Sequence, residues 1–183
     1  NNTIVYKQEY GSYDIIACHH GYGYYEKLDI VNGRFVNAAD IENKTKVVVI
    51  GITVEKALFK GANPMGEYIK VSGVPFKVVG VFDDGGDERE TSRVYIPLST
   101  AQTVFNMGNR LYNICITTED IETATSAFMV EEIRRNLALK HKFSLDDTRA
   151  VHIYNNLEEY QNGTDPTVAP STWLMGSCLQ SMS

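Results

Sequence analysis

The chain has 183 residues and a formal net charge of −6, from 17 Lys and Arg against 23 Asp and Glu. Apolar residues make up 43% of it, and a chain of this length can bury a hydrophobic core without metal or disulfide staples. The acidic balance counts against a nucleic-acid-binding protein and against a polybasic membrane-surface module. No run of about 18 apolar residues occurs, so the sequence predicts no membrane-spanning helix.

The N-terminus carries no initiator Met, basic region or apolar region, and residues 1–3 lead directly into a strand-like segment. We therefore expect the chain to be a fragment of a larger protein. The three cysteines, Cys18, Cys115 and Cys178, are too far apart for a Cys-x-x-Cys site. Buried free thiols are the expectation, and a Cys18–Cys115 disulfide is left open.

The first fifty residues are predicted to be rich in strands. Short strands are expected at residues 4–6 and 13–18, with a break at Gly11-Ser12. A short helical turn is expected from Asn37 to Ile41. The β-branched run 46–51 does not alternate between apolar and polar residues, so we expect a strand buried on both faces.

Between residues 53 and 102 the sequence predicts two capped helices and a hairpin. Thr53 is expected to N-cap a short helix that Gly61 ends, and Ser99 is expected to form a capping box with Gln102. Segments 68–71 and 76–82 form the predicted hairpin. Strict alternation along its second arm assigns Phe76, Val78 and Phe82 to one face, and Lys77, Val79 and Val81 to the other.

The last third contains the one long predicted helix, from about residue 120 to 141, between strands at 112–117 and 151–154. Its apolar stripe is expected to consist of Ala127, Val130, Ile133 and Leu137. Residues 161–183 are expected to be a flexible or non-native tail. Because strands and helices are interspersed without a regular βαβ repeat, the predicted fold class is α+β.

No residue pattern predicts a catalytic, cofactor-binding or metal-binding site. On a strand, His19 and His20 would point to opposite faces and could not share one metal. The acidic loop 83–90 lacks the alternating ligands of a calcium loop, and Gly21-Tyr22-Gly23 lacks the context of a phosphate-binding loop. No Gly-x-Ser-x-Gly nucleophile elbow occurs. We therefore expect a non-enzymatic protein without cofactors.

One series of short motifs is specific in its order and spacing. It contains Gly33-Arg34-Phe35, then Asp40, the run 46–51 and Asn63-Pro64-Met65-Gly66, and it continues through 76–81 to 94–102. This series resembles the signature of the extracytoplasmic domains of MacB/FtsX-like ABC transporter permeases. Weaker similarity extends from about residue 1 to residue 160. From the residues themselves, the glycines and prolines of the series indicate turns and close backbone approaches. Arg34 is expected to form an exposed ion pair with Asp40, of the kind that contributes at most about 1 kcal/mol.

The resemblance implies two lobes. Residues 1–24 and 103–160 would form a βαβ-rich, membrane-proximal lobe, its N-terminal part truncated, and residues 25–102 an inserted, mostly-β lobe. The implied location is the bacterial inner membrane, with this domain facing the periplasm. The implied partners are the permease's transmembrane helices, a second permease copy, an ABC ATPase subunit or domain, and a periplasmic adaptor or lipoprotein carrier, with no nucleic acid.

The implied function is non-catalytic: coupling of cytoplasmic ATP hydrolysis to periplasmic movement and partner contact, in efflux or in lipoprotein or peptide export. Ten residues are predicted to be structural: Gly33, Arg34, Phe35, Asp40, Gly51, Asn63, Pro64, Gly66, Gly80 and Pro97. Five are candidates for partner contact: Tyr22, Tyr24, Tyr25, Asp83 and Asp84. The alternatives are a ligand-binding sensor domain of a membrane receptor, which would need an apolar pocket, and a secreted enzyme, which would need a catalytic cleft.

Overall fold

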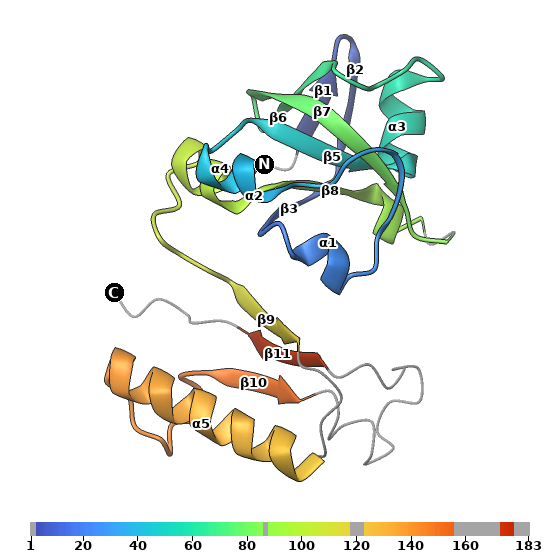
Figure 1. The fold of residues 1–183 in the computed structure, drawn as a ribbon. Coiled ribbons are helices and arrows are strands. Elements are labelled where there is room, and N and C mark those ends of the chain that lie inside the picture. The colour runs from blue at the N-terminus through green and yellow to red at the C-terminus, as the bar shows by residue number, and fades with distance from the viewer. Residues whose placement is uncertain (1–2, 86–87, 118–122, 156–172, 178–183) are drawn as a thin grey trace. The chain divides into compact units, whose positions relative to one another are not determined.

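The computed structural model describes residues 3–85, 88–117, 123–155 and 173–177 (Figure 1). It divides into two compact units, Asn1–Asn109 and Arg110–Ser183. This division differs from the expected lobes, because residues 1–24 do not separate from 25–102. The N-terminal strands pair with strands of the expected inserted lobe, β1 with β6 and β3 with β8.

The first unit is a mixed sheet with the strand order β2-β1-β6-β7-β5-β8-β3, and β4 also pairs with β7. The pairs β5–β7 and β3–β8 are parallel, and the others are antiparallel. The strands are β1 (Thr3–Tyr6), β2 (Glu9–Ser12), β3 (Asp14–Cys18), β4 (Asp29–Gly33), β5 (Val47–Gly51), β6 (Tyr68–Val71), β7 (Val74–Asp83) and β8 (Arg93–Pro97). The helices are α1 (Tyr22–Tyr25), α2 (Ala38–Glu42), α3 (Ile52–Phe59), the 3-10 turn η1 (Glu90–Ser92) and α4 (Leu98–Val104).

The sequence predicted the central strand β5 but neither β2 nor β4, each of which pairs with a single neighbouring strand. All five residues of β5 are buried, as its unbroken apolar run indicated. The break expected at Gly11-Ser12 is wrong, because both residues belong to β2, which pairs with β1. The chain turns earlier instead, at Lys7, which has a positive φ of 53°.

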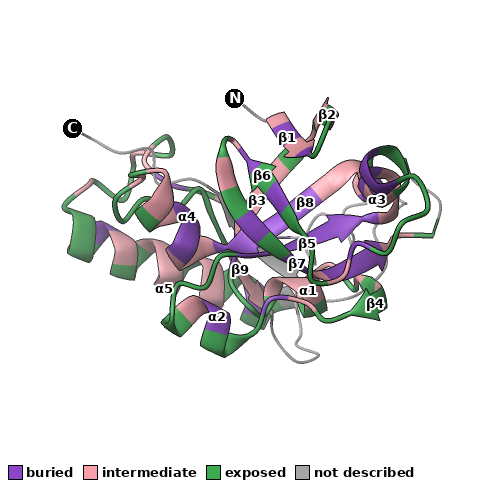
Figure 2. Ribbon diagram, turned by 90° about the horizontal axis from the view of Figure 1, so that it is seen from above, coloured by how far each residue is buried: buried purple, intermediate pink, exposed green. Residues whose placement is uncertain are grey.

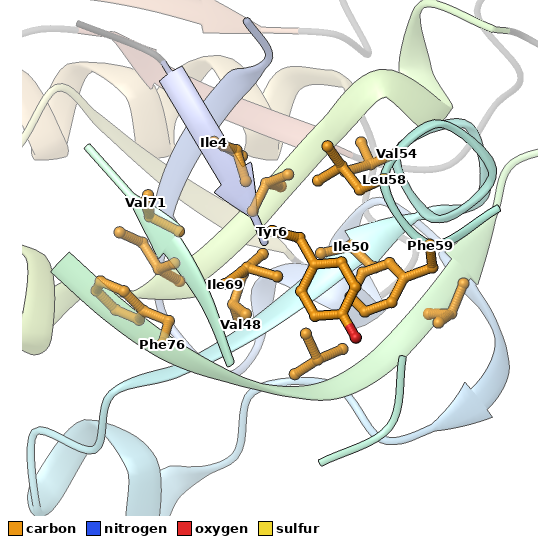
Figure 3. Close-up of a cluster of buried hydrophobic side chains, with 14 of the residues drawn as sticks. Ile4, Tyr6, Val48, Ile50, Val54, Leu58, Phe59, Ile69, Val71 and Phe76 are labelled. Atoms are coloured by element: carbon orange, nitrogen blue, oxygen red, sulfur yellow. The ribbon is translucent and has the colours of Figure 1, made fainter. Parts of the chain in front are cut away.

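The main hydrophobic core lies between one face of this sheet and the helices α3 and α4 (Figures 1 and 3). In Figure 3 the rings of Tyr6 and Phe59 lie side by side, and their centroids are 4.1 Å apart. A second, smaller core covers part of the other face, with Phe82 and Tyr95 fully buried in it. The central strands are therefore buried on both faces, as the composition of β5 requires.

A β-bulge in β7 overturns the predicted alternation of the hairpin's second arm. Val48 pairs with Val78, but Val49 pairs with Gly80, so Val79 is an extra residue opposite β5. An inserted residue reverses the faces of all that follow it. Val81 consequently packs in the main core with Phe76 and Val78, and Phe82 packs in the second core.

Two predicted helix N-caps are also wrong. Gly51, not Thr53, occupies the N-cap of α3, and the Thr53 hydroxyl pairs with that of Thr91 at 2.8 Å. Ser99 lies inside α4 and donates to the carbonyl of Ile41 at 2.5 Å, while Pro97 is the N-cap. The turn expected at residues 37–41 is α2, which Asn37 caps.

The second unit consists of β9 (Asn113–Thr117), α5 (Thr123–His141), β10 (His152–Asn155) and β11 (Trp173–Ser177). β11 lies within the expected tail, yet it pairs antiparallel with both β9 and β10. The Ser126 hydroxyl, buried on α5, bonds the Asn155 amide oxygen at 2.8 Å. Of the predicted stripe, Val130, Ile133 and Leu137 are half-buried, but Ala127 is exposed. Figure 2 shows mostly exposed and intermediate colours along α5. The predicted start of α5 at residue 120 lies outside the described residues.

Candidate functional site

The motif residues around Gly33 and Gly80 bring the end of β4 against the middle of β7. The Arg34 N–H donates to the carbonyl of Val79 at 2.9 Å. A Cβ atom on Gly80 would lie 2.2 Å from the Arg34 carbonyl oxygen, and one on Gly33 would lie 2.2 Å from that of Val79. Gly33 also has a positive φ of 75°. Both positions therefore require glycine.

The next two motif residues, Arg34 and Asp40, form a bidentate ion pair. The guanidinium approaches the two carboxylate oxygens at 2.6 and 3.1 Å. Asp40 is buried, and its carboxylate also accepts from the Asn37 N–H at 3.0 Å, completing the capping box of α2. The pair was expected to be exposed; in fact only the arginine is half-exposed, at 45% of its side chain.

Asn63, Pro64 and Gly66 form the turn that leads into β6. The Asn63 side-chain oxygen accepts from the Met65 N–H at 3.0 Å, and the Pro64 carbonyl accepts from the Glu67 N–H at 3.1 Å. Gly66 has a φ of 83°, the conformation a type II turn requires at this position. Its N–H donates to the Val78 carbonyl at 2.9 Å, so this turn is fastened to β7.

The remaining motif residues also make structural contacts. Gly51 lies so close to η1 that a Cβ atom would be 1.9 Å from the Thr91 carbonyl oxygen. Pro97 ends β8 and begins α4, with a φ of −62°. The ring of Phe35 packs edge-on against Tyr95, with centroids 5.5 Å apart. Each of these contacts fixes the backbone or packs the core.

The tyrosine-rich segment forms the short helix α1 beside the edge strand β3 (Figure 1). Tyr22 is half-buried, with its ring centroid 5.7 Å from that of Tyr25 and 5.8 Å from that of Tyr95. Tyr24 points away from this packing and is 83% exposed. The three tyrosine candidates for partner contact therefore differ in exposure, and Tyr24 is the one whose ring is exposed to solvent.

A surface hollow of about 690 Å³ brings Tyr22 together with the acidic loop. Its lining residues are Asp14, Ile15, Ile16, Tyr22, Glu26, Asp84, Glu90 and Arg93. Arg93 forms an ion pair with Glu90, which leaves three other carboxylates in the lining. Asp83, the fifth candidate, is half-buried at the end of β7 and accepts from the Asp84 N–H at 2.8 Å. Residues 86 and 87 of the loop lie outside the described residues.

Two titratable side chains in the core beneath Tyr22, Tyr95 and Cys18, are held in their protonated forms. Burial, with a smaller contribution from the charge of Glu26, raises the pKa of the Tyr95 hydroxyl. Burial alone raises the pKa of the Cys18 thiol to about 12, so Cys18 is no nucleophile at neutral pH. Cys18 and Cys115 are both free thiols. Tyr95 and Cys18 therefore contribute packing to the second core.

The two neighbouring histidines follow β3, so the predicted opposite orientation of their rings is wrong. The ring centroids of His19 and His20 are 4.2 Å apart. Desolvation, and then the charge of His20, lowers the pKa of His19. Across the described ranges, no group of three or more His, Cys, Asp or Glu side chains is arranged to hold a metal ion. Within the same ranges, no helix has both the length and the apolar character needed to cross a membrane.

Solved structures of two transporter domains share this fold. The periplasmic region of MacB from Actinobacillus actinomycetemcomitans aligns with a TM-score of 0.66 at 18% identity, over 92% of this chain and 73% of that one. The extracellular domain of YknZ, an ABC-type transporter of Gram-positive bacteria, aligns with a TM-score of 0.64 at 21% identity, over 78% of this chain and 72% of that one. The fold is thus that of extracytoplasmic domains of ABC-type transporters.

The model of the MacB-like periplasmic core domain matches residues 2–133. The chain belongs to this family, and it is the periplasmic domain of a MacB-like permease. The macrolide export protein MacB of Azoarcus sp. is 30% identical over 104 residues, 55% of this chain. That of Marinobacter nauticus is 26% identical over 179 residues, 96% of this chain. The pyoverdine export protein PvdT of Pseudomonas aeruginosa is 40% identical over 76 residues, 39% of this chain. The chain spans 16%, 27% and 12% of these three relatives.

Proposed function

We propose that this chain couples ATP hydrolysis by a separate cytoplasmic domain or subunit to movement and partner contact outside the membrane. The process served would be efflux, or lipoprotein or peptide export, from a bacterial inner membrane. The match of residues 2–133 to the MacB-like periplasmic core domain carries this proposal. The partners would be the permease's transmembrane helices, a second permease copy, an ATPase, and a periplasmic adaptor or lipoprotein carrier.

The packing of the first unit supports movement as a rigid body. Gly33 and Gly80 bring the backbones of β4 and β7 into direct contact. The N–H of Gly66 fastens the turn before β6 to β7, and Gly51 brings β5 against η1. Such close contacts have little room to adjust, so a displacement at one end of the unit is transmitted to the other. The described residues also contain no catalytic constellation that would suggest chemistry in this unit.

The hollow beside α1 is the proposed partner-contact surface, together with the exposed ring of Tyr24. Tyrosine is enriched at protein interfaces, and an acidic rim favours a partner with Lys or Arg at the matching positions. Tyr22 and Asp84 lie in the hollow itself, while Tyr25 and Asp83 support them from α1 and β7. This surface would contact the adaptor or carrier.

The sensor alternative gains no support from this hollow. A ligand-binding sensor is expected to have a largely apolar pocket with a few convergent polar groups. Here charged side chains, including Asp14 and Glu26, dominate the lining. A thermal-shift screen of the chain against a metabolite panel tests this directly, because a ligand that binds only the folded state raises the melting temperature.

The coupling proposal is tested in the full-length permease, reconstituted with its ATPase. The substitutions Tyr24→Ser and Asp84→Lys should reduce export while leaving ATP hydrolysis unchanged. Tyr10→Ser is the matched control, because Tyr10 is 77% exposed on β2 and does not line the hollow. Export that is unchanged by both variants would exclude the hollow as the contact surface. ATP turnover by the purified chain alone would contradict its non-catalytic role.

A further inference from the structure

The exposed face of the β6–β7 hairpin carries an aromatic ring beside two lysines. Along β6, Ile69 and Val71 point into the main core (Figure 3), whereas the alternate residues Tyr68 and Lys70 are exposed. Tyr68 pairs with Lys77 of β7, which is exposed as well. Residues directly opposite in an antiparallel pair lie on one face, with Cβ atoms about 5 Å apart. Tyr68 is 62% exposed, and with Lys70 and Lys77 it forms the hairpin site.

The hairpin site is positively charged although the chain as a whole is acidic. Neither of its lysines forms an ion pair with a described residue. The neighbouring carboxylates are held on the other side of the sheet. Glu9 forms an ion pair with Lys60, which follows α3, at 2.7 Å, and Glu67 accepts from the Tyr6 hydroxyl at 3.1 Å. Because Tyr6 and α3 pack in the main core, these carboxylates do not neutralise the lysines.

The hairpin site lies where the second core ends. Val79, two residues after Lys77 on the same face, packs against the second core, whereas Pro75 is exposed. All three residues of the site belong to residues 25–102, and not to the lobe whose N-terminal part is expected to be truncated. The site is therefore a shallow, uncovered part of the sheet within the first unit.

We propose that the hairpin site binds an acidic sugar residue of an anionic polysaccharide. The ring of Tyr68 can stack on the C–H groups of a pyranose, because the face of an aromatic ring carries partial negative charge. Lys70 and Lys77 are diagonal neighbours about 7–8 Å apart, and both ammonium groups can reach one carboxylate or phosphate of that sugar. The proposal does not depend on the proposed function.

The composition of the site favours a polysaccharide over an acidic protein or a lipid surface. Lysine is depleted in protein interfaces, where arginine is enriched. Segments that lie in a membrane surface insert several large apolar side chains, but Tyr68 is the one large exposed apolar side chain of this hairpin. A sugar polymer requires only one ring and one charge contact for each bound unit, and repeated units raise the effective concentration at the site.

The test titrates the full chain with trigalacturonic acid and follows the backbone amide signals by NMR. We expect the shifted signals to be concentrated in Tyr68–Val71 and Val74–Lys77. Tyr68→Ser should weaken the binding about fivefold through loss of the ring contact. Lys70→Gln and Lys77→Gln should each weaken it about threefold, as expected for an exposed charge contact.

Two matched variants outside the site should leave the affinity unchanged. Tyr10→Ser removes a ring that is 77% exposed on the same face, but β1 separates its strand β2 from β6. Lys56→Gln removes an exposed lysine from α3, on the other side of the sheet. The NMR spectra of all variants also verify that the fold is retained.

Three further probes distinguish the occupants. Maltotriose has the sugar rings without the charge, and triglutamate has the charge without the rings, so both should bind much more weakly than trigalacturonic acid. Triglutamate binding of equal strength would overturn the proposal in favour of an acidic protein. Tyr68-dependent sedimentation with phosphatidylglycerol vesicles would overturn it in favour of a lipid surface. Absence of shifts at β6 and β7, or an unchanged affinity of Tyr68→Ser, would also overturn it.

Discussion

The α-carbon of Gly80 faces the backbone of Arg34 so closely that an added methyl group would lie 2.2 Å from the Arg34 carbonyl oxygen. The obstacle is backbone rather than the flexible end of a side chain, so relief requires moving β4 away from β7. That movement would also break the hydrogen bond from the Arg34 N–H to the Val79 carbonyl. This contact explains why a glycine occurs here in the motif series.

We predict that Gly80→Ala lowers the free energy of unfolding by roughly 2–4 kcal/mol, the range of strongly destabilising core substitutions. Urea denaturation followed by circular dichroism measures it. Gly21→Ala is the matched control, because Gly21 has a φ of −74° and nothing lies within 4 Å of its Cβ position. Equal stability of the two variants would show that β4 and β7 separate easily at this point.

The second prediction concerns the Arg34–Asp40 pair. Arg34→Ala leaves a buried carboxylate with the Asn37 backbone as its remaining described partner, and we expect a loss of about 2 kcal/mol, less than for a fully buried pair because Arg34 is half-exposed. Adding Asp40→Asn should recover part of this loss, since it removes the buried charge. Denaturation of both variants tests this order. A double variant less stable than Arg34→Ala would show that packing, rather than the stranded charge, carries the cost.

The buried thiol gives a prediction about pH. Because burial raises the pKa of Cys18 to about 12, its thiolate is scarce at pH 8 and increases with every unit of pH up to that value. A chain with Cys115→Ser and Cys178→Ser should therefore react very slowly with iodoacetamide at pH 8, and rapidly once unfolded in urea. Mass spectrometry follows the labelling. Fast labelling of the folded chain would mean that β3 opens readily.

The raised pKa of Cys18 also makes the free energy of unfolding depend on pH. A folded-state pKa above that of the unfolded chain stabilises the fold below the unfolded pKa of about 8.5. This contribution is lost as the pH rises toward 12. Replacing Cys18 with Ala should therefore flatten the alkaline decline in stability. An unchanged alkaline profile in this variant would assign the decline to other groups.

The parts of the fold that the sequence could predict depend on local patterns. The apolar run of β5 and the short helix expected at residues 37–41 are each readable within six residues, and both are confirmed. The series of motifs identified the family because each motif is a short local pattern, and the order and spacing of the motifs can be read directly from the sequence. The bulge at Val79 could not be predicted from the sequence, because it leaves the apolar composition of β7 unchanged. It only exchanges the faces on which the residues after Val79 lie.

The candidate site shows the same limit. Tyr22 and Asp84 were singled out separately, but their convergence in one hollow depends on the parallel pairing of β3 with β8, which joins distant segments. Asp40 was expected to form an exposed pair, and its burial comes from contacts that α2 makes with the rest of the first unit. Burial and convergence are tertiary properties, and periodicity within one segment does not encode them.

β11 gives the last prediction, because it occupies the centre of the sheet β10-β11-β9. A chain ending at residue 160 would leave the backbone of β9 and β10 without their shared partner. We expect its amide protons at Asn113–Thr117 and His152–Asn155 to exchange much faster than in the full chain. Hydrogen exchange read by mass spectrometry tests this, with β5 as an internal control that should not change. Equal protection in the two chains would mean that residues 161–183 contribute nothing to the fold, as their composition alone suggested.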